Sequence, residues 1–280
     1  MDIKNILVHI DSSERCAERL GIAATLAKQH DAHLSGLYVI PEPFYPIYAE
    51  SAFVSAELIE SMEGESREGC ETAQENFRAF ADRENLPAEW REEQGSIGPV
   101  VSRHARYADL TIIGKGNLEE PIKYPNAFLA ADVVMQSGRP VLVIPNEGHF
   151  DGVGRRMMVC WNASRESVRA VNDALPLLQA ADKVTVLAVN PQKPASGDHG
   201  EIPCADIALY LARHGVKAEA ASIMTEIDDI GEIILSRAFD LDIDLIVSGA
   251  YGHSRTREWI LGGVTETLLS DTEVPVFLAH

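Results

Sequence analysis

Short, continuous apolar runs alternate with longer amphipathic stretches along the chain. In the second half we expect strands near residues 156–161, 183–189, 218–223, 243–248 and 274–279, and helices near 165–180, 203–214, 228–238 and 256–270. The first of these helices places Val168, Val171 and Leu175 on one face. Strands that are apolar throughout and separated by helices indicate an α/β fold with a parallel sheet that helices cover on both faces.

The chain is an internal duplication. Three aligned pairs of residues define it: Asp11 with Asn162, Gly114 with Gly249, and Pro140 with Pro275. The first pair is 151 positions apart and the other two are 135 apart, so the first half holds 16 more residues ahead of Asp109. We place these extra residues in the stretch 41–85, which contains a proline-rich loop and a long polar helical segment.

A short linker that contains several glycines joins the two copies of the repeat. It follows the last apolar run of the first half, so we predict one domain over residues 1–146, a linker over 147–154 and a second domain over 155–280. Each domain is long enough to bury a hydrophobic core of its own.

The acidic composition narrows the classes of partner. Of the 280 residues, 24 are Lys or Arg and 43 are Asp or Glu, which gives a formal net charge of −19 at pH 7. A surface of this charge repels phosphate backbones and anionic membranes, so we expect neither nucleic acid nor a membrane as partner. The sequence shows no membrane-span pattern and no signal-peptide pattern, and its four cysteines are scattered. We therefore expect a cytoplasmic protein with reduced thiols.

The clearest candidate for chemistry follows the fourth apolar run of the second half. Its glycines are Gly249, Gly252, Gly262 and Gly263. They surround a strand-to-helix transition, where open α/β sheets bind ligands. Glycine lets backbone N–H groups approach an anion, and the start of the next helix adds the N–H groups of Val264 and Thr265. The Thr265 hydroxyl is a further candidate ligand for a phosphate oxygen or a metal ion.

This segment resembles the nucleotide loop of the universal stress protein family, G-x2-G-x9-G-(S/T). Gly249, Gly252 and Gly262 match in identity and spacing, whereas Gly263 stands where the family prefers Ser or Thr. The resemblance covers nearly the whole chain as two domains in tandem. It implies two doubly wound domains with a five-stranded parallel sheet each, which pair through their last strands as an internal pseudo-dimer. It also implies ATP, ADP or AMP as the ligand.

The resemblance extends the candidate site to Asn162, Ala163, Ser164, Val189, His253 and Ser254. The family places an Asp near the adenosine, and this position is Asp11 in the first half but Asn162 in the second. The Asn162 amide oxygen can still accept a hydrogen bond. Val189 stands where the family packs against adenine, with a plain core position as the alternative. His253 is placed for phosphate contact, with an exposed turn residue as the alternative.

The first half lacks this loop. The positions that correspond to Gly252, Gly262, Gly263 and Thr265 are Asn117, Ala127, Phe128 and Ala130. The Phe128 side chain would fill the space that a phosphate needs, and the segment also contains Pro121 and Pro125. We therefore expect phosphate binding only in the second half. The first half keeps a structural or partner-binding role, or takes another small ligand.

The predicted function is an adenine-nucleotide-binding stress-response protein with little or no turnover, since no general base or catalytic motif accompanies the loop. If ATP is hydrolysed, Mg²⁺ is expected to bridge its phosphates. The cluster of Asp198, His199 and Cys204 fits a surface loop better than a metal site. The alternatives are a nucleotide-independent scaffold, favoured by the degenerate first loop, and a slow ATPase. A further homodimer stays open.

Overall fold

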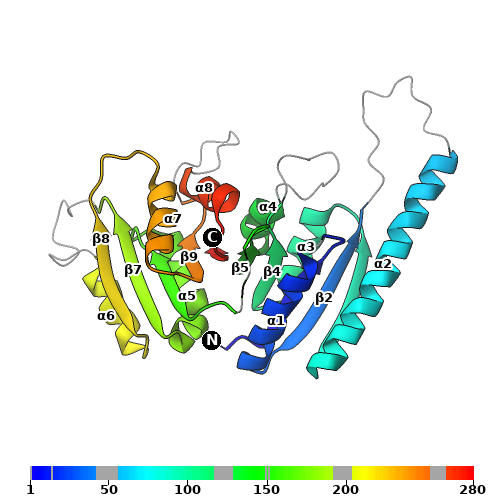
Figure 1. The fold of residues 1–280 in the computed structure, drawn as a ribbon, viewed down its shortest axis with the longest axis horizontal. Coiled ribbons are helices and arrows are strands. Elements are labelled where there is room, and N and C mark those ends of the chain that lie inside the picture. Colours follow the sequence, from blue (N-terminus) through cyan, green and yellow to red (C-terminus); the bar gives the residue numbers. More distant parts are fainter. Residues whose placement is uncertain are drawn as a thin grey trace, which may run out of the picture.

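The structure is a computed structural model that describes residues 2–13, 15–41, 56–116, 129–148, 150, 152–191, 204–252 and 263–280. Two halves of similar architecture lie side by side (Figure 1). The first half contains β1 (Asn5–Ile10), α1 (Cys16–His30), β2 (His33–Ile40), α2 (Ala56–Glu84), β3 (Ala88–Gln94), α3 (Ile97–Ala105), β4 (Leu110–Gly114), α4 (Leu129–Ser137) and β5 (Val141–Ile144).

The second half repeats this order. It contains β6 (Arg156–Cys160), α5 (Arg165–Ala180), β7 (Lys183–Val189), α6 (Ala205–Arg213), β8 (Ala218–Ile223), α7 (Ile230–Asp240), β9 (Leu245–Gly249), α8 (Gly263–Asp271) and β10 (Val276–Ala279). The alternation expected from the apolar runs is therefore confirmed for this half. The residues before Gly263 in the expected helix 256–270 lie outside the described residues.

The two halves share one sheet. Its strand order is β3-β2-β1-β4-β5-β10-β9-β6-β7-β8. The strands within each half are parallel, and β5 pairs with β10 in antiparallel register, with Leu142 opposite Phe277. The predicted pairing through the last strands is thus confirmed, and the internal pseudo-dimer is a continuous ten-stranded sheet.

Two hydrophobic cores cover the two faces of this sheet. Apolar side chains of α1, α2, α5 and α6 contribute to one core, and those of α3, α4, α7 and α8 contribute to the other. The central strands supply buried residues to both cores, which is why their sequences are mostly apolar. The edge strands β3 and β8 are only partly buried and carry polar residues. The doubly wound arrangement expected from the sequence is confirmed in both halves.

Helix α2 accounts for much of the difference in length between the halves. It spans 29 residues, whereas α6, at the equivalent place of the second half, spans 9. Figure 1 shows α2 running along the outer flank of the first half. The extra residues of the first half lie at least partly in this helix, inside the stretch 41–85 where we expected them.

The predicted shared face of α5 is confirmed for Val171 and Leu175, which packs against the core, and is wrong for Val168. Val171 is buried, but the side chain of Val168 is 44% exposed. The face that meets the sheet contains Ser167, Ala170 and Ala174. Small side chains at these positions allow the helix to approach β9 closely, and this contact outweighs the burial of a larger valine.

None of the described helices combines the length and the apolar composition that a membrane crossing requires.

Candidate functional site

The candidate site lies where the strand order of the second half reverses. Strand β6 sits between β7 and β9, and its Cys160 pairs with Ser248 of β9. The helix after β6 packs on one face of the sheet, whereas the helix after β9 packs on the other. Ligands of open α/β sheets bind beyond the carboxyl ends of the strands at such a point. Asn162 follows β6 here, and Gly249 ends β9.

Asn162 opens a tight turn into α5. Its Oδ1 atom accepts a hydrogen bond from Ser164 N–H at 3.0 Å, and Ala163 between them has a positive φ of 59°. Ser164 then caps the helix, because its Oγ accepts from Ser167 N–H at 3.2 Å. The amide oxygen predicted to face a ligand is therefore engaged in the turn, with one lone pair left for a second donor.

Gly249 is the point of closest approach between β9 and α5. A Cβ atom built on Gly249 would lie 2.5 Å from the carbonyl carbon of Glu166 and 2.5 Å from the backbone nitrogen of Ser167. Both neighbours are backbone atoms of the first turn of α5. Only glycine fits there unless the helix moves away from the sheet.

Replacing Gly249 with Ala is expected to lower the free energy of unfolding by about 1–3 kcal/mol, because the added methyl group overpacks a rigid contact. Gly252→Ala is the matched control, since a Cβ at that position meets only side-chain atoms, of Glu166 and Ser164. Urea denaturation of both variants measures the difference. Equal stabilities of the two variants would contradict the close contact at Gly249.

Gly252 is exposed and faces the start of α5. A Cβ atom on Gly252 would lie 2.8 Å from Oε2 of Glu166 and 3.6 Å from Oγ of Ser164. The Glu166 side chain therefore reaches from the backbone contact at Gly249 to the neighbourhood of Gly252. The sequence analysis did not single out Glu166, because only the packing of α5 on β9 brings it to the glycines of residues 249–263, called the glycine segment below.

Thr265 ties the beginning of α8 to the end of β9. Its side chain is 5% exposed, and its Oγ1 accepts a hydrogen bond from Tyr251 N–H at 3.4 Å. Tyr251 has a positive φ of 59°, and burial raises the pKa of its hydroxyl to about 12. The Thr265 hydroxyl keeps its own proton for another acceptor. It thus fixes the two ends of the glycine segment to each other.

The remaining predicted residues fall in three places. Gly263 begins α8, is exposed, and has open space around the position of a Cβ atom. Val264 is half-buried. Val189 at the end of β7 packs against the hydrophobic core that includes residues of α7 and α8. His253, Ser254 and Gly262 lie outside the described residues.

The same switch point of the first half is occupied by an arginine. Arg19 of α1 is 2% exposed, and its Nη2 donates a hydrogen bond to Oδ1 of Asp11 at 2.5 Å. Its Nη1 donates to Oγ of Ser13 at 3.2 Å. A Cβ atom on Gly114 would lie 2.5 Å from Nη1, so the guanidinium lies directly against the end of β4.

The two halves differ most at this helix position. Ala170 stands 151 residues after Arg19, the same offset that relates Asp11 to Asn162. In the second half the backbone of α5 at Glu166 and Ser167 meets Gly249, whereas in the first half the Arg19 side chain lies beside Gly114. The sequence analysis missed Arg19. The available signal was a charged residue aligned with an alanine on the buried face of the duplicated helix.

Arg19 and the other neighbours of Asp11 determine the pKa of its carboxyl. Burial by itself would raise the pKa of the Asp11 carboxyl, but the charges of Arg19 and His9, with hydrogen bonds from Ser13 and Arg19, hold it below its usual value. His9 is 2% exposed, and its burial lowers its pKa to about 4. The first half therefore holds an ion pair between the buried Arg19 and the half-buried Asp11, beside a histidine that is neutral at pH 7.

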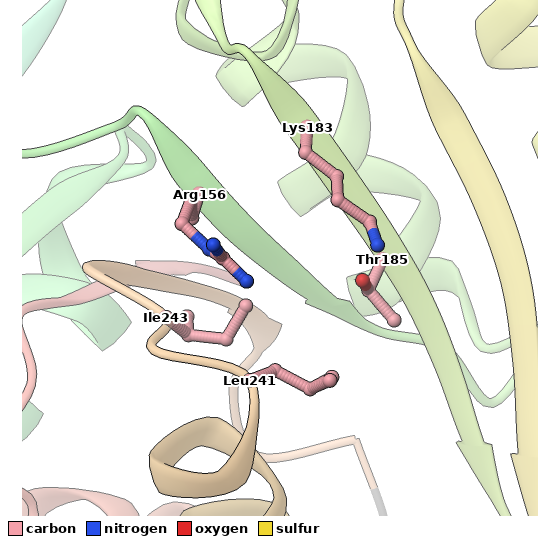
Figure 2. A pocket seen from close by; sticks show the side chains of 5 residues that line it. All are labelled: Arg156, Lys183, Thr185, Leu241 and Ile243. Atoms are coloured by element: carbon pink, nitrogen blue, oxygen red, sulfur yellow. The ribbon is translucent and has the colours of Figure 1, made fainter.

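A surface hollow lies at the opposite end of the second-half strands. It is lined by Arg156, Lys183, Thr185, Leu241 and Ile243 (Figure 2). Lys183 pairs with Glu219 at 2.7 Å, and the hollow has no room for a water molecule. It lies at the amino ends of β6 and β7, away from the glycine segment. Within the described ranges, no group of three or more His, Cys, Asp or Glu side chains could hold a metal ion.

Comparison with known proteins identifies the family. The model of the universal stress protein family matches residues 2–145 and again residues 154–280. The chain belongs to the universal stress protein family. The tandem arrangement expected from the duplication is confirmed by the two matches.

One relative by sequence and two solved structures are similar to nearly the whole chain. The universal stress protein Slr1230 of Synechocystis is 23% identical over 305 residues, which cover 98% of this chain and 99% of that protein. A universal stress protein of Archaeoglobus fulgidus has a similar structure, with a TM-score of 0.73 at 15% identity over 99% of this chain and 96% of that one. A functionally unknown protein of Pseudomonas aeruginosa gives a TM-score of 0.63 at 14% identity, over 99% and 92% of the two chains. These structures share the fold of the whole chain.

Proposed function

We propose that the second domain, residues 155–280, binds an adenine nucleotide (ATP, ADP or AMP) with little or no turnover. The observation that carries this proposal is the position of the glycine segment. Gly249 ends β9 at the switch point of the sheet, beside the strand that leads to the Asn162 turn, Gly252 follows it, and the described part of α8 starts at Gly263. This is the place and the spacing of the family's nucleotide loop.

Backbone groups supply the binding chemistry in this proposal. In this proposal, backbone N–H groups near the start of α8, among them those of Gly263, Val264 and Thr265, bind the phosphates, because unpaired N–H groups gather at the positive end of a helix. Such groups bind phosphate oxygens without any charged side chain. They therefore remain effective in a chain whose formal net charge is −19.

The expectation of low turnover rests on the sequence, in which no known catalytic motif accompanies the glycines. A carboxylate is able to act as a general base and Glu166 lies beside Gly252, so the measurement of phosphate release decides this part of the proposal. Thr265 and Tyr251 are neutral at pH 7, since burial raises the pKa of the Tyr251 hydroxyl to about 12. Glu166 and Thr265 offer the oxygen atoms that Mg²⁺ prefers, should the ion accompany the nucleotide. An ion held by these oxygen atoms would offset part of the negative charge of the phosphates.

The cellular setting is part of the same proposal. We place the protein in the cytoplasm because Cys16, Cys70, Cys160 and Cys204 are free thiols. We place it in a stress response because of the family to which the chain belongs. Residues 147–154 link the two domains. A homodimer of whole chains is compatible with the fold, since β5 and β10 already pair within one chain and leave β3 and β8 at the edges of the sheet.

The test begins with mass spectrometry of small molecules released from the denatured protein, followed by calorimetric titration with ATP, ADP and AMP. One adenine nucleotide per chain is expected. Gly252→Asp should weaken binding by at least about tenfold, because its carboxylate would lie beside Glu166 and face the phosphates. Phosphate release measured in parallel reports any turnover.

Asn117→Asp is the matched control for this variant. It adds the same charge at the equivalent position of the first half, 135 residues earlier, and is expected to leave the affinity unchanged. Absence of bound nucleotide and of any heat of binding would contradict the proposal. A nucleotide-independent scaffold would then be the better description of the protein.

A further inference from the structure

The side chain of Glu166 lies along the glycine segment of the proposed site. A Cβ atom on Gly249 would lie 2.9 Å from Cβ of Glu166, and one on Gly252 would lie 2.8 Å from its Oε2. The stem of the side chain thus begins against one glycine, and the carboxylate ends against the other. Because backbone contacts at Gly249 fix the start of α5, the carboxylate is held close to Gly252.

This position places a negative charge where the proposed site would receive phosphate. Gly252 is exposed, and its nearest neighbours from outside the segment are atoms of Glu166 and Ser164. Ser164 is neutral. The positive end of α5 favours a carboxylate in its first turn, so Glu166 has a structural reason to stay there. A phosphate chain that lies over Gly252 meets this carboxylate at short range.

We infer that Glu166 sets the ligand preference of the second domain, which selects adenine nucleotides of low charge over free ATP. The inference rests on the proposed function and names the class of ligand within it. The repulsion between Glu166 and the ligand grows with each phosphate charge. Adenosine escapes it, AMP meets little of it, and ATP without a cation meets most of it. Mg²⁺ bound to ATP offsets part of this charge and narrows the difference.

The test compares affinities of the wild-type chain and Glu166→Gln by calorimetry at low salt. Adenosine, AMP and ATP are each titrated with EDTA present, and ATP is titrated again with excess Mg²⁺. Glutamine has nearly the shape of glutamate, so the contacts at the glycines are kept and only the charge is removed. Glu232→Gln is the matched control, because Glu232 also lies in the first turn of a helix of this half and is exposed.

The wild type is expected to bind AMP more tightly than free ATP. Glu166→Gln should raise the affinity for free ATP by about tenfold, raise that for AMP by less, and leave adenosine unchanged. With Mg²⁺ the gain for ATP should shrink. Glu232→Gln should match the wild type with every ligand.

Two results would overturn the inference. One is an equal change in affinity for adenosine and ATP, which would indicate a steric role for Glu166. The other is tight binding of free ATP by the wild type with no gain in Glu166→Gln. Failure of both chains to bind any of the three ligands is a separate outcome, because it would overturn the proposed function and the inference with it.

Discussion

Replacing Arg19 with Met is expected to lower the free energy of unfolding by about 3 kcal/mol, the lower end of the range for breaking a buried ion pair, because the Asp11 side chain is 22% exposed. Arg19 is 2% exposed and is held at 2.5 Å from the Asp11 carboxylate. Methionine fills much of the volume of the arginine stem but leaves Asp11 without its charge partner inside the protein. Urea denaturation, monitored by circular dichroism, measures the loss.

The double variant Asp11→Asn/Arg19→Met is the control for this prediction. It removes both charges, and Asn at position 11 reproduces Asn162 of the second half. Because no uncompensated charge is left buried, the double variant should be more stable than Arg19→Met alone. If the two variants unfold at the same urea concentration, the ion pair is not the origin of the loss.

The second large effect is a loss of stability in mild acid that depends on His9. Its pKa is lowered to about 4 by burial, assisted by Arg19 and opposed by Asp11, whereas an exposed histidine titrates near 6.5. Between these two pH values the unfolded chain takes up a proton that the folded chain does not. The contribution of His9 is therefore complete above pH 6.5 and falls by about 3 kcal/mol as the pH drops to 4.

His9→Cys isolates this contribution. Cys160 occupies the equivalent position of the second half, and burial raises the pKa of its thiol to about 12, so a cysteine there stays neutral throughout this range. Between pH 7 and pH 4 the free energy of unfolding of the wild type should fall by about 3 kcal/mol more than that of the variant. Parallel curves for the two proteins would show that the His9 imidazole is free to take up a proton in the folded state.

The two halves differ in how the helix after their first strand meets the glycine that ends their fourth strand. In the first half the space beside Gly114 holds the Arg19 guanidinium, and Asp11 is neutralised within the protein. In the second half Ala170 is small, the backbone of α5 meets Gly249, and Glu166 points along the glycine segment. This asymmetry supports the proposal that the second half alone holds a ligand site.

Much of the site was accessible from sequence because it depends on backbone geometry. The glycine spacing at 249 and 252 follows from what a strand-to-helix transition needs, and the Asn162 turn follows from its alignment with Asp11. Arg19 and Glu166 were not accessible in this way. Their roles depend on how far two helices stand from the sheet, and this distance is set by side chains on both surfaces.

The sequence by itself determined the α/β fold, the duplication, the order of the strands and helices in the second half, and the positions of its glycines along the chain. Each of these follows from local hydrophobic periodicity, turn chemistry or internal repetition, which are properties of neighbouring residues. Only the tertiary structure decided which face of α5 meets β9, that Thr265 accepts a hydrogen bond from Tyr251, and that the Arg19 side chain fills the space beside Gly114 in the first half. The physical reason is that close packing depends on the sizes of residues far apart in the sequence. A pattern of apolar positions records that a helix is buried but not how closely it approaches its neighbour.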